Sequence, residues 1–167
     1  MTYNSCQGLP DVYNEEQSWC RPTIYQVVPL SFTGNTIYQV YCASGQVMKF
    51  REIISIVEGK VVTQKANLAV EVKCICAADL MSDVLAFAKP ESVLVTGLCN
   101  PQVVNTANIA DIVAIIFVRG KYPPLEVTVL AEEEGVPVVV TSHSMFETCG
   151  RLYQAGLESV GIPDNHT

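Results

Sequence analysis

The chain has 167 residues, of which 49% are hydrophobic and 16% are charged, and its formal net charge is −7. This length fits one ordinary domain, and the apolar content excludes a disordered chain. The acidic balance argues against a general nucleic-acid binder, which needs a basic face to meet phosphates. The longest apolar run, Ile112–Val118, is too short to span a bilayer, and the N-terminus has no signal-peptide pattern. We therefore expect a cytoplasmic protein with no nucleic-acid or membrane partner.

The first 47 residues differ in composition from the rest of the chain. They hold five of the seven tyrosines, the only tryptophan (Trp19) and no lysine. Two β-like runs, Thr23–Leu30 and Thr36–Cys42, predict a β-hairpin. We expect residues 1–47 to be an N-terminal extension that the rest of the chain does not need for folding. Two interpretations stay open: a start codon assigned too early, with translation beginning at Met48, or a lineage-specific extension whose strands pair with a sheet edge or a partner.

From Met48 onward, helix-like and strand-like patterns alternate. Apolar residues at helical spacing predict helices in Met48–Val57 and after Asp79, Asn100-Pro101, Pro123-Pro124 and Ser144. Strand-like runs are Lys60–Thr63, Ala69–Cys76, Ser92–Thr96, Ile112–Val118 and Val136–Val140. This alternation with short connections predicts an α/β fold, with a mainly parallel sheet covered by helices, over residues 48–158. We expect residues 159–167 to be a flexible tail.

Several side chains have predicted places in these helices. Asp79 is expected to cap a helix whose inward stripe is Leu80, Met81, Val84, Leu85 and Ala88. Asn100 is expected to cap the next helix, with Pro101 in its first turn. Ser144 and Glu147 form a capping-box pattern, and Phe146, Cys149 and Tyr153 follow at the spacing of one helix face. We expect Phe146 and Cys149 to point into the core.

Seven cysteines at irregular spacing make a poor disulfide framework. Cys74 and Cys76 are two residues apart in a β-like run, so their side chains share one sheet face. Such a pair could bind a metal only with ligands from elsewhere in the chain. The simpler interpretation is a pair of buried thiols, and we predict no metal site.

The loops after the predicted strands are the expected functional site, because ligands of open α/β sheets sit beyond the carboxyl ends of the strands. These loops combine glycines, helix N-termini and two cations, which suits an anion such as phosphate or a nucleotide. The predicted ligand-binding residues are Asp79, Gly97, Asn100, Arg119, Gly120, Lys121, Thr141, Ser142, His143 and Ser144. A structural explanation exists for each part: the glycines form tight turns, Ser144 caps a helix, and Arg119 and Lys121 are solvated charges.

Catalytic motifs are not found in the sequence. There is no Walker loop, no G-x-G-x-x-G after a strand and no G-x-S-x-G elbow. We therefore predict a non-catalytic protein without catalytic residues, and no cofactor other than a nucleotide or phosphorylated ligand.

Several segments between Met48 and about Leu157 carry a family resemblance. They are Ala78-Asp79-Leu80-Met81-Ser82-Asp83-Val84-Leu85, Val95-Thr96-Gly97-Leu98 with Asn100-Pro101-Gln102, Phe117-Val118-Arg119-Gly120, Leu130-Ala131-Glu132-Glu133 with Gly135-Val136-Pro137, and Cys149-Gly150-Arg151-Leu152-Tyr153. With this spacing the stretch resembles a DRTGG domain of the stand-alone kind. The family is named for a Gly-Asp-Arg element and a Thr-Gly-Gly element. The matching positions here read Gly97-Leu98-Cys99-Asn100 and Val118-Arg119-Gly120, so only the glycines are kept.

The resemblance implies a compact α/β domain that is commonly a homodimer. Members of this family occur in regulatory parts of some phosphate acetyltransferases, beside CBS domains, or encoded near iron-only hydrogenase genes in anaerobes. It therefore implies a regulatory or sensing domain of anaerobic energy metabolism that binds a small anionic metabolite. The alternative is a structural accessory or assembly protein for a hydrogenase or related redox enzyme, with no small-molecule ligand.

Overall fold

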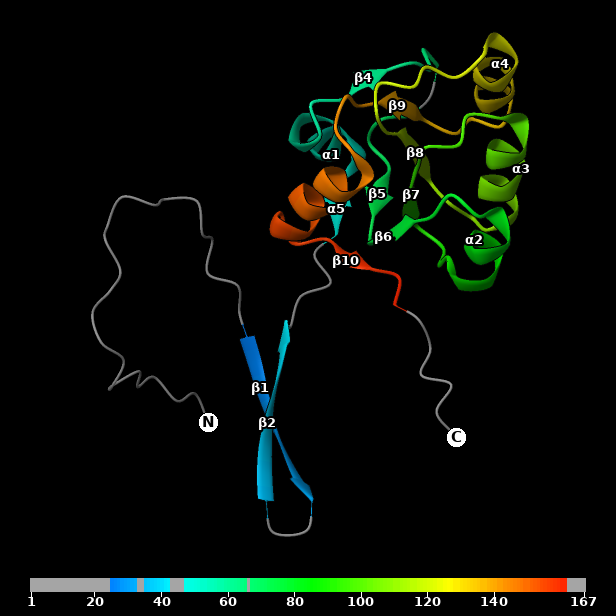
Figure 1. Ribbon diagram of the computed structural model, residues 1–167. Helices are drawn as coiled ribbons and strands as arrows, with labels where there is room; N and C mark the ends of the chain where they lie inside the picture. The colour runs from blue at the N-terminus through cyan, green and yellow to red at the C-terminus, as the bar shows by residue number, and fades with distance from the viewer. Residues whose placement is uncertain (1–24, 33–34, 43–46, 66, 162–167) are drawn as a thin grey trace, which may run out of the picture. The chain divides into compact units, whose positions relative to one another are not determined.

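The computed structural model describes residues 25–32, 35–42, 47–65 and 67–161, and the chain divides into two compact units, Met1–Ala43 and Ser44–Thr167. In the first unit, β1 (Tyr25–Phe32) and β2 (Asn35–Cys42) pair antiparallel (Figure 1). The predicted β-hairpin is therefore confirmed. That the rest of the chain folds without residues 1–47 stays a prediction.

Six strands form the main sheet of the second unit (Figure 1). Their order is β10-β6-β7-β8-β9-β4, with the bounds Glu158–Ser159, Cys74–Ala77, Ser92–Thr96, Ala114–Phe117, Val138–Val140 and Lys60–Val61. All neighbours pair parallel except β4, which runs antiparallel to β9. A separate antiparallel pair joins β3 (Met48–Lys49) to β5 (Glu71–Val72). The predicted α/β fold with a mainly parallel sheet is confirmed.

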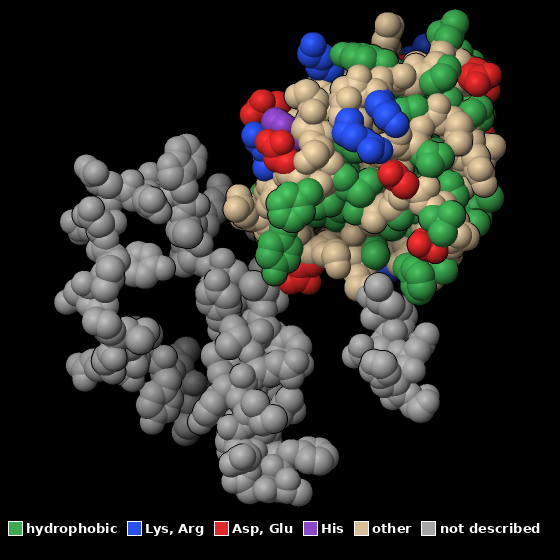
Figure 2. Space-filling view, in the orientation of Figure 1, with side chains coloured by type: hydrophobic (Ala, Val, Ile, Leu, Met, Phe, Trp, Pro, Cys, Tyr) green, Lys and Arg blue, Asp and Glu red, His purple; other side chains and the backbone are tan. Residues whose placement is uncertain are grey.

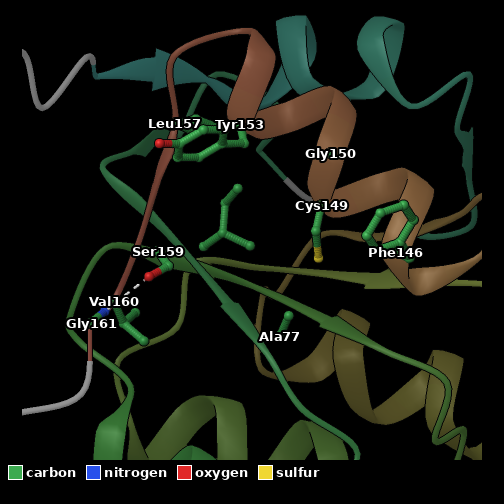
Figure 3. A pocket seen from close by; sticks show the side chains of 10 residues that line it. Ala77, Phe146, Cys149, Gly150, Tyr153, Leu157, Ser159, Val160 and Gly161 are labelled. Carbon is green, nitrogen blue, oxygen red and sulfur yellow. Dashed lines mark hydrogen bonds between the residues drawn. The ribbon is translucent and has the colours of Figure 1, made fainter. Parts of the chain in front are cut away.

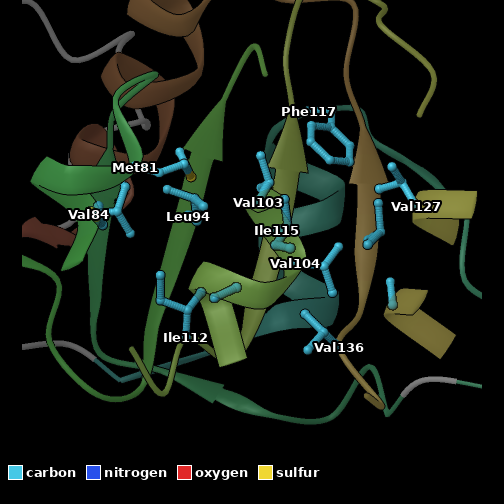
Figure 4. Packing of buried hydrophobic residues seen from close by; sticks show 14 of the residues in the cluster. Met81, Val84, Leu94, Val103, Val104, Ile112, Ile115, Phe117, Val127 and Val136 are labelled. Carbon is cyan, nitrogen blue, oxygen red and sulfur yellow. The ribbon is translucent and has the colours of Figure 1, made fainter. Parts of the chain in front are cut away.

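Helices cover both faces of this sheet. The described residues form α1 (Phe50–Ile56), α2 (Met81–Phe87), α3 (Pro101–Ile109), α4 (Leu125–Glu133) and α5 (Met145–Gln154). On one face, α2, α3 and α4 bury side chains such as Met81, Val104 and Val127 against the sheet (Figure 4). On the other face, α1 and α5 bury Phe50, Ile53 and Leu152. The second unit therefore has three layers, with the sheet in the middle.

The central strands are apolar because both of their faces are covered. In β7, Leu94 packs with α2, α3 and α4, whereas Val93 and Val95 pack with α1 and α5. Successive side chains of a strand point to opposite faces, so a doubly covered strand has no polar side. All residues of β7 and β8 are buried. This confirms the strand predicted for the apolar run Ile112–Val118. None of the helices in the described part of the chain is long and apolar enough to cross a membrane.

Three boundaries differ from the prediction. Met48–Lys49 is a strand and not the start of a helix. The run Ala69–Cys76 is interrupted at Lys73, because its two halves pair with different sheets. The predicted tail, 159–167, overlaps a strand, since Ser159 belongs to β10 and the Val160 N–H donates to the Ile75 carbonyl of β6. The rest of that tail, 162–167, lies outside the described residues. In each case a pairing with a distant strand decides the boundary, which a local pattern does not show.

The predicted inward stripe of α2 is only partly correct. Met81 and Val84 are buried, but Leu80 and Leu85 are 59% and 51% exposed. Leu80 takes the N-cap position without a side-chain hydrogen bond, so the prediction that Asp79 caps this helix is wrong. The buried residues of this seven-residue helix are Met81 and Val84, and Ala88, directly after its end, packs partly against the same core.

The prediction that Phe146 and Cys149 point into the core from α5 is wrong for Phe146 and correct for Cys149, which packs against the core on the α1–α5 side of the sheet. Phe146 is 90% exposed, Tyr153 is 66% exposed and Cys149 is half-buried. The buried residues of α5 are Thr148 and Leu152, which are four apart and lie on one helix face. The two aromatic residues of the apolar stripe, Phe146 and Tyr153, therefore do not face the sheet.

Candidate functional site

Four loops meet at the carboxyl-end edge of the parallel sheet. Asp79 follows β6, Gly97 follows β7, Arg119 follows β8 and Thr141 follows β9. Because β6, β7, β8 and β9 are adjacent and parallel, these loops lie side by side. The structure thus brings together residues that are up to 62 positions apart in the sequence, from Asp79 to Thr141.

The Asp79 carboxylate is held by the end of the neighbouring strand. Its Oδ1 accepts hydrogen bonds from the Thr96 hydroxyl at 3.0 Å and from the Gly97 backbone N–H at 2.7 Å. Its Oδ2 lies 3.4 Å from Nη2 of Arg119. The Gly97 N–H above all, then the Thr96 hydroxyl and the Arg119 charge, hold the pKa of Asp79 below its ordinary value of 3.8, against an opposing effect of burial. Asp79 is therefore a fixed anion that positions Arg119.

The Arg119 side chain lies over Gly97. A Cβ on Gly97 would overlap the Arg119 guanidinium, so this close approach requires glycine. Arg119 itself has φ +63°, in the left-handed region, and its backbone N–H donates to the carbonyl of His143 at 2.8 Å. The strand-end loop therefore fixes the Arg119 backbone, and its side chain remains about half exposed.

The Lys121 side chain also reaches Gly97. Its Nζ donates to the Gly97 carbonyl at 3.0 Å. Arg119 and Lys121 are both exposed. Lys and Arg side chains lie next to each other on the face of the second unit shown in Figure 2. Two cations thus converge on Gly97 beside one carboxylate.

The loop after β9 supports the Arg119 loop through its backbone. The Gly120 N–H donates to the Thr141 carbonyl at 2.8 Å. The buried hydroxyl of Thr141 donates to the Val57 carbonyl at 2.6 Å and accepts from the His143 N–H at 3.2 Å. Ser142 is exposed next to this support. Thr141 therefore stabilises the loop and does not present its hydroxyl to solvent.

The His143 imidazole belongs to a separate cluster of charges. Its Nδ1 lies 3.0 Å from Oε1 of Glu147, and its Nε2 lies 3.7 Å from Oε2 of Glu58. Arg151 pairs with Glu58 at 2.9 Å and with Glu147 at 3.1 Å. These contacts connect the end of α1 to α5. His143 is thus near the Arg119 loop through its backbone, while its side chain contacts α5.

Asn100 and Ser144 cap helices, as predicted. The Asn100 Oδ1 accepts from the Val103 N–H at 3.3 Å, and the Ser144 hydroxyl accepts from the Glu147 N–H at 3.2 Å. The Glu147 carboxylate pairs with His143 and Arg151, so the reciprocal half of a capping box is not formed. A ligand contact by Asn100 or Ser144 stays a prediction.

Sequence reasoning missed two features of this region. Thr96 contributes a hydroxyl to Asp79, and the only signal for it is a polar residue at the end of an apolar strand. The Glu58–Arg151 pair spans 93 residues of sequence and has no local signal.

The described cysteines are free thiols. Burial raises the pKa of Cys74, Cys76, Cys99 and Cys149, which keeps them protonated. Cys74 and Cys76 both pack on the α2–α4 side of the sheet, as expected for residues two apart in a strand. Within the described ranges, no group of three or more His, Cys, Asp or Glu side chains could hold a metal ion.

A cavity of about 480 Å³ lies beside α5 (Figure 3), and neither Arg119 nor Lys121 lines it. It is lined by Ile75, Ala77, Phe146, Cys149, Gly150, Tyr153, Leu157, Ser159, Val160 and Gly161. The lining is mostly apolar and includes the two exposed aromatic residues of α5. None of these residues belongs to the predicted ligand-binding set.

Comparisons with known proteins agree with this architecture. A family model described as the DRTGG domain matches residues 52–155. The chain is also similar to a solved structure described as the CBS and DRTGG domains of the regulatory region of Clostridium perfringens pyrophosphatase complexed with activator, diadenosine tetraphosphate. The TM-score is 0.55 and the identity is 16%, over 71% of this chain and 52% of that one, so the chain spans about half of that structure's length. This likeness shows the fold. Among curated proteins, none matches the chain.

Proposed function

Because the chain belongs to the DRTGG domain family, we propose that residues 48–158 form a non-catalytic regulatory domain that binds a small anionic ligand. The ligand class is a nucleotide or another phosphorylated metabolite. The binding site is the edge of the sheet where Asp79, Gly97, Arg119 and Lys121 meet.

The observation that carries this proposal is the convergence of Arg119 and Lys121 on Gly97. Among the described residues, the Arg119 guanidinium makes one hydrogen bond, to Asp79, so most of its five N–H donors are available to a ligand. A planar guanidinium binds phosphate oxygens through two parallel hydrogen bonds, and the Lys121 ammonium adds a second positive charge. Asp79 holds the guanidinium in place before a ligand arrives, which lowers the cost of ordering it.

The relative from Clostridium perfringens supports the nucleotide class. Its regulatory region is described in complex with the activator diadenosine tetraphosphate. That compound carries four phosphates and two nucleosides, so it combines anionic and planar groups. We propose the same class for this chain, with the phosphates at Arg119 and Lys121.

The family resemblance extends the proposal to the biological setting. The domain is proposed to be a cytoplasmic homodimer in anaerobic energy metabolism, with a hydrogenase or related redox enzyme as its partner. Ligand binding would then report the level of a metabolite to that partner.

Thermal unfolding of the full chain tests the ligand class. The compounds are ATP, diadenosine tetraphosphate, acetyl phosphate and inorganic phosphate. A compound that binds only the folded state stabilises it by about 2.7 kcal/mol when its free concentration is about 100 times its dissociation constant. For a unit of this size, that corresponds to a rise of about 10 °C in the unfolding midpoint. The proposal predicts such a rise with at least one compound. No rise with any of the four would contradict it and favour an accessory protein without a small-molecule ligand.

A further inference from the structure

The outward stripe of α5 has a symmetric order of residues. Phe146, Cys149, Gly150 and Tyr153 follow each other at steps of three, one and three, so the order of the steps is the same in both directions. These residues share one face of the helix, and all four line the cavity beside α5 (Figure 3). The midpoint of the stripe lies between Cys149 and Gly150.

This symmetry has a physical consequence for helix packing. If a second α5 crosses the first in the antiparallel direction about a two-fold axis at this midpoint, Phe146 of each copy meets Tyr153 of the other, and Cys149 of each copy meets Gly150 of the other. Such an isologous contact uses the same patch twice, which is the commonest arrangement of homodimers. Aromatic pairs add about 0.5–1.5 kcal/mol beyond their buried area, and the symmetry forms the Phe146–Tyr153 pair twice.

Gly150 is suited to the crossing point. It is exposed, and a Cβ placed on it would meet nothing within 4 Å. Packing within its own chain therefore does not require glycine here, and glycine in a helix interior is unfavourable. A glycine at the centre of an exposed helix face lets a second backbone approach closely.

The surroundings of the stripe also fit a second copy. The exposed Phe146 ring stands beside an apolar cavity of about 480 Å³ on the same face, so each copy offers both a protruding side chain and a hollow. The charged residues of α5, Glu147 and Arg151, pair with His143 and Glu58 at the side of the stripe and leave its centre uncharged. An uncharged apolar centre with polar groups at the edge is typical of protein interfaces.

The exposed area is in the range that a dimer needs. An aromatic side chain buries about 150–250 Å². At 90% and 66% exposure, Phe146 and Tyr153 together present about 300 Å² per copy, or about 600 Å² for two copies. A standard interface buries at least about 1,200 Å² in total, so the two aromatic residues supply about half of it.

We infer that the α5 face, defined as Phe146, Cys149, Gly150 and Tyr153 with the adjacent cavity, is the surface on which a second copy of this chain docks. This inference rests on the homodimer named in the proposed function and assigns its contact surface. It does not depend on the ligand at Arg119.

Sedimentation velocity of the full chain at micromolar concentrations tests this surface. The variants are Phe146→Glu, which places a charge in the interface, and Gly150→Leu, which fills the crossing point. The control is Ile109→Glu on α3, where the side chain is 73% exposed on the opposite side of the sheet. Circular dichroism of each variant verifies that the fold is retained.

The expected result is a dimer for the wild type and for Ile109→Glu. Phe146→Glu and Gly150→Leu should each raise the dissociation constant of the dimer at least about tenfold, as expected for residues at the centre of an interface. A monomeric wild type would overturn both the surface and the homodimer, while anion binding would be judged separately by the thermal unfolding assay. Folded variants that stay as dimeric as the wild type would overturn the surface alone.

Discussion

Replacing Asp79 with alanine tests how the site is held together. The change removes the acceptor for the Thr96 hydroxyl at 3.0 Å and for the Gly97 N–H at 2.7 Å. A hydrogen bond to a charged group contributes about 1.5–3 kcal/mol. Since the Asp79 side chain is 47% exposed, competition with water reduces each bond to about half of that value. The exposed ion pair with Arg119 adds less than about 0.5 kcal/mol. We therefore expect Asp79→Ala to lower the free energy of unfolding by about 2 kcal/mol.

Urea unfolding at pH 7 measures this loss, with Asp83→Ala on the exposed side of α2 as the control. The control should change the free energy of unfolding by less than about 0.5 kcal/mol. If Asp79→Ala is as stable as the control, the two hydrogen bonds do not hold the strand ends, and our account of the site is wrong.

The effect of Asp79 also depends on pH. Folding lowers the pKa of Asp79 below its ordinary value of 3.8, so the ionised carboxylate stabilises the folded state above that pH. The contribution is lost as the pH falls through the lower pKa of the folded state. The difference in stability between the wild type and Asp79→Ala should be constant between about pH 5 and 7 and shrink below about pH 3.8. A difference that persists undiminished at lower pH would show that the charge is not its source.

Three further predictions concern the site, the core and the extension. Gly97→Ala should displace the Arg119 guanidinium and weaken the binding of ATP in calorimetric titrations. The free energy of unfolding should change by less than about 1 kcal/mol, because only the flexible Arg119 side chain must move. Unchanged ATP binding would contradict the role of this close approach. Leu94→Ala should lower the free energy of unfolding in urea by about 3–5 kcal/mol, because the Leu94 side chain is fully buried. Leu85 is half-exposed, so Leu85→Ala should lower it by less than about 1.5 kcal/mol. Equal losses for the two variants would contradict the packing. A chain of residues 48–167 should unfold cooperatively with heat, and an insoluble or non-cooperative product beside a well-behaved full chain would show that residues 1–47 are needed for folding.

The sequence predicts the sheet well because burial on two faces leaves a strong pattern. Ser92–Thr96 is predicted as a strand with the bounds of β7, and the run Ile112–Val118 contains β8. The caps at Asn100 and Ser144 are also correct, since a capping side chain acts within three residues of its own position. Local interactions of this kind are encoded in short segments.

Contacts between distant segments explain what the sequence does not predict. Asp79 has the residue type and position of a helix cap, but two donors at the end of β7 are available to it, and these depend on the order of the strands. The stripe Phe146–Cys149–Tyr153 has core spacing, yet only Cys149 packs partly against the core, and α5 buries Thr148 and Leu152 instead. Helical spacing identifies an apolar face and does not say whether the same chain or a partner covers it.

Calorimetric titration of ATP and diadenosine tetraphosphate into the full chain tests the central claim most directly. The variant is Arg119→Ala, and the control is Lys89→Ala, which removes an exposed cation after α2. Charge-assisted hydrogen bonds contribute about 1.5–3 kcal/mol, so Arg119→Ala should weaken binding by roughly 10- to 150-fold while Lys89→Ala binds as the wild type does. If Arg119→Ala binds both compounds as tightly as the wild type, the anion does not bind at the edge formed by Asp79, Gly97, Arg119 and Lys121.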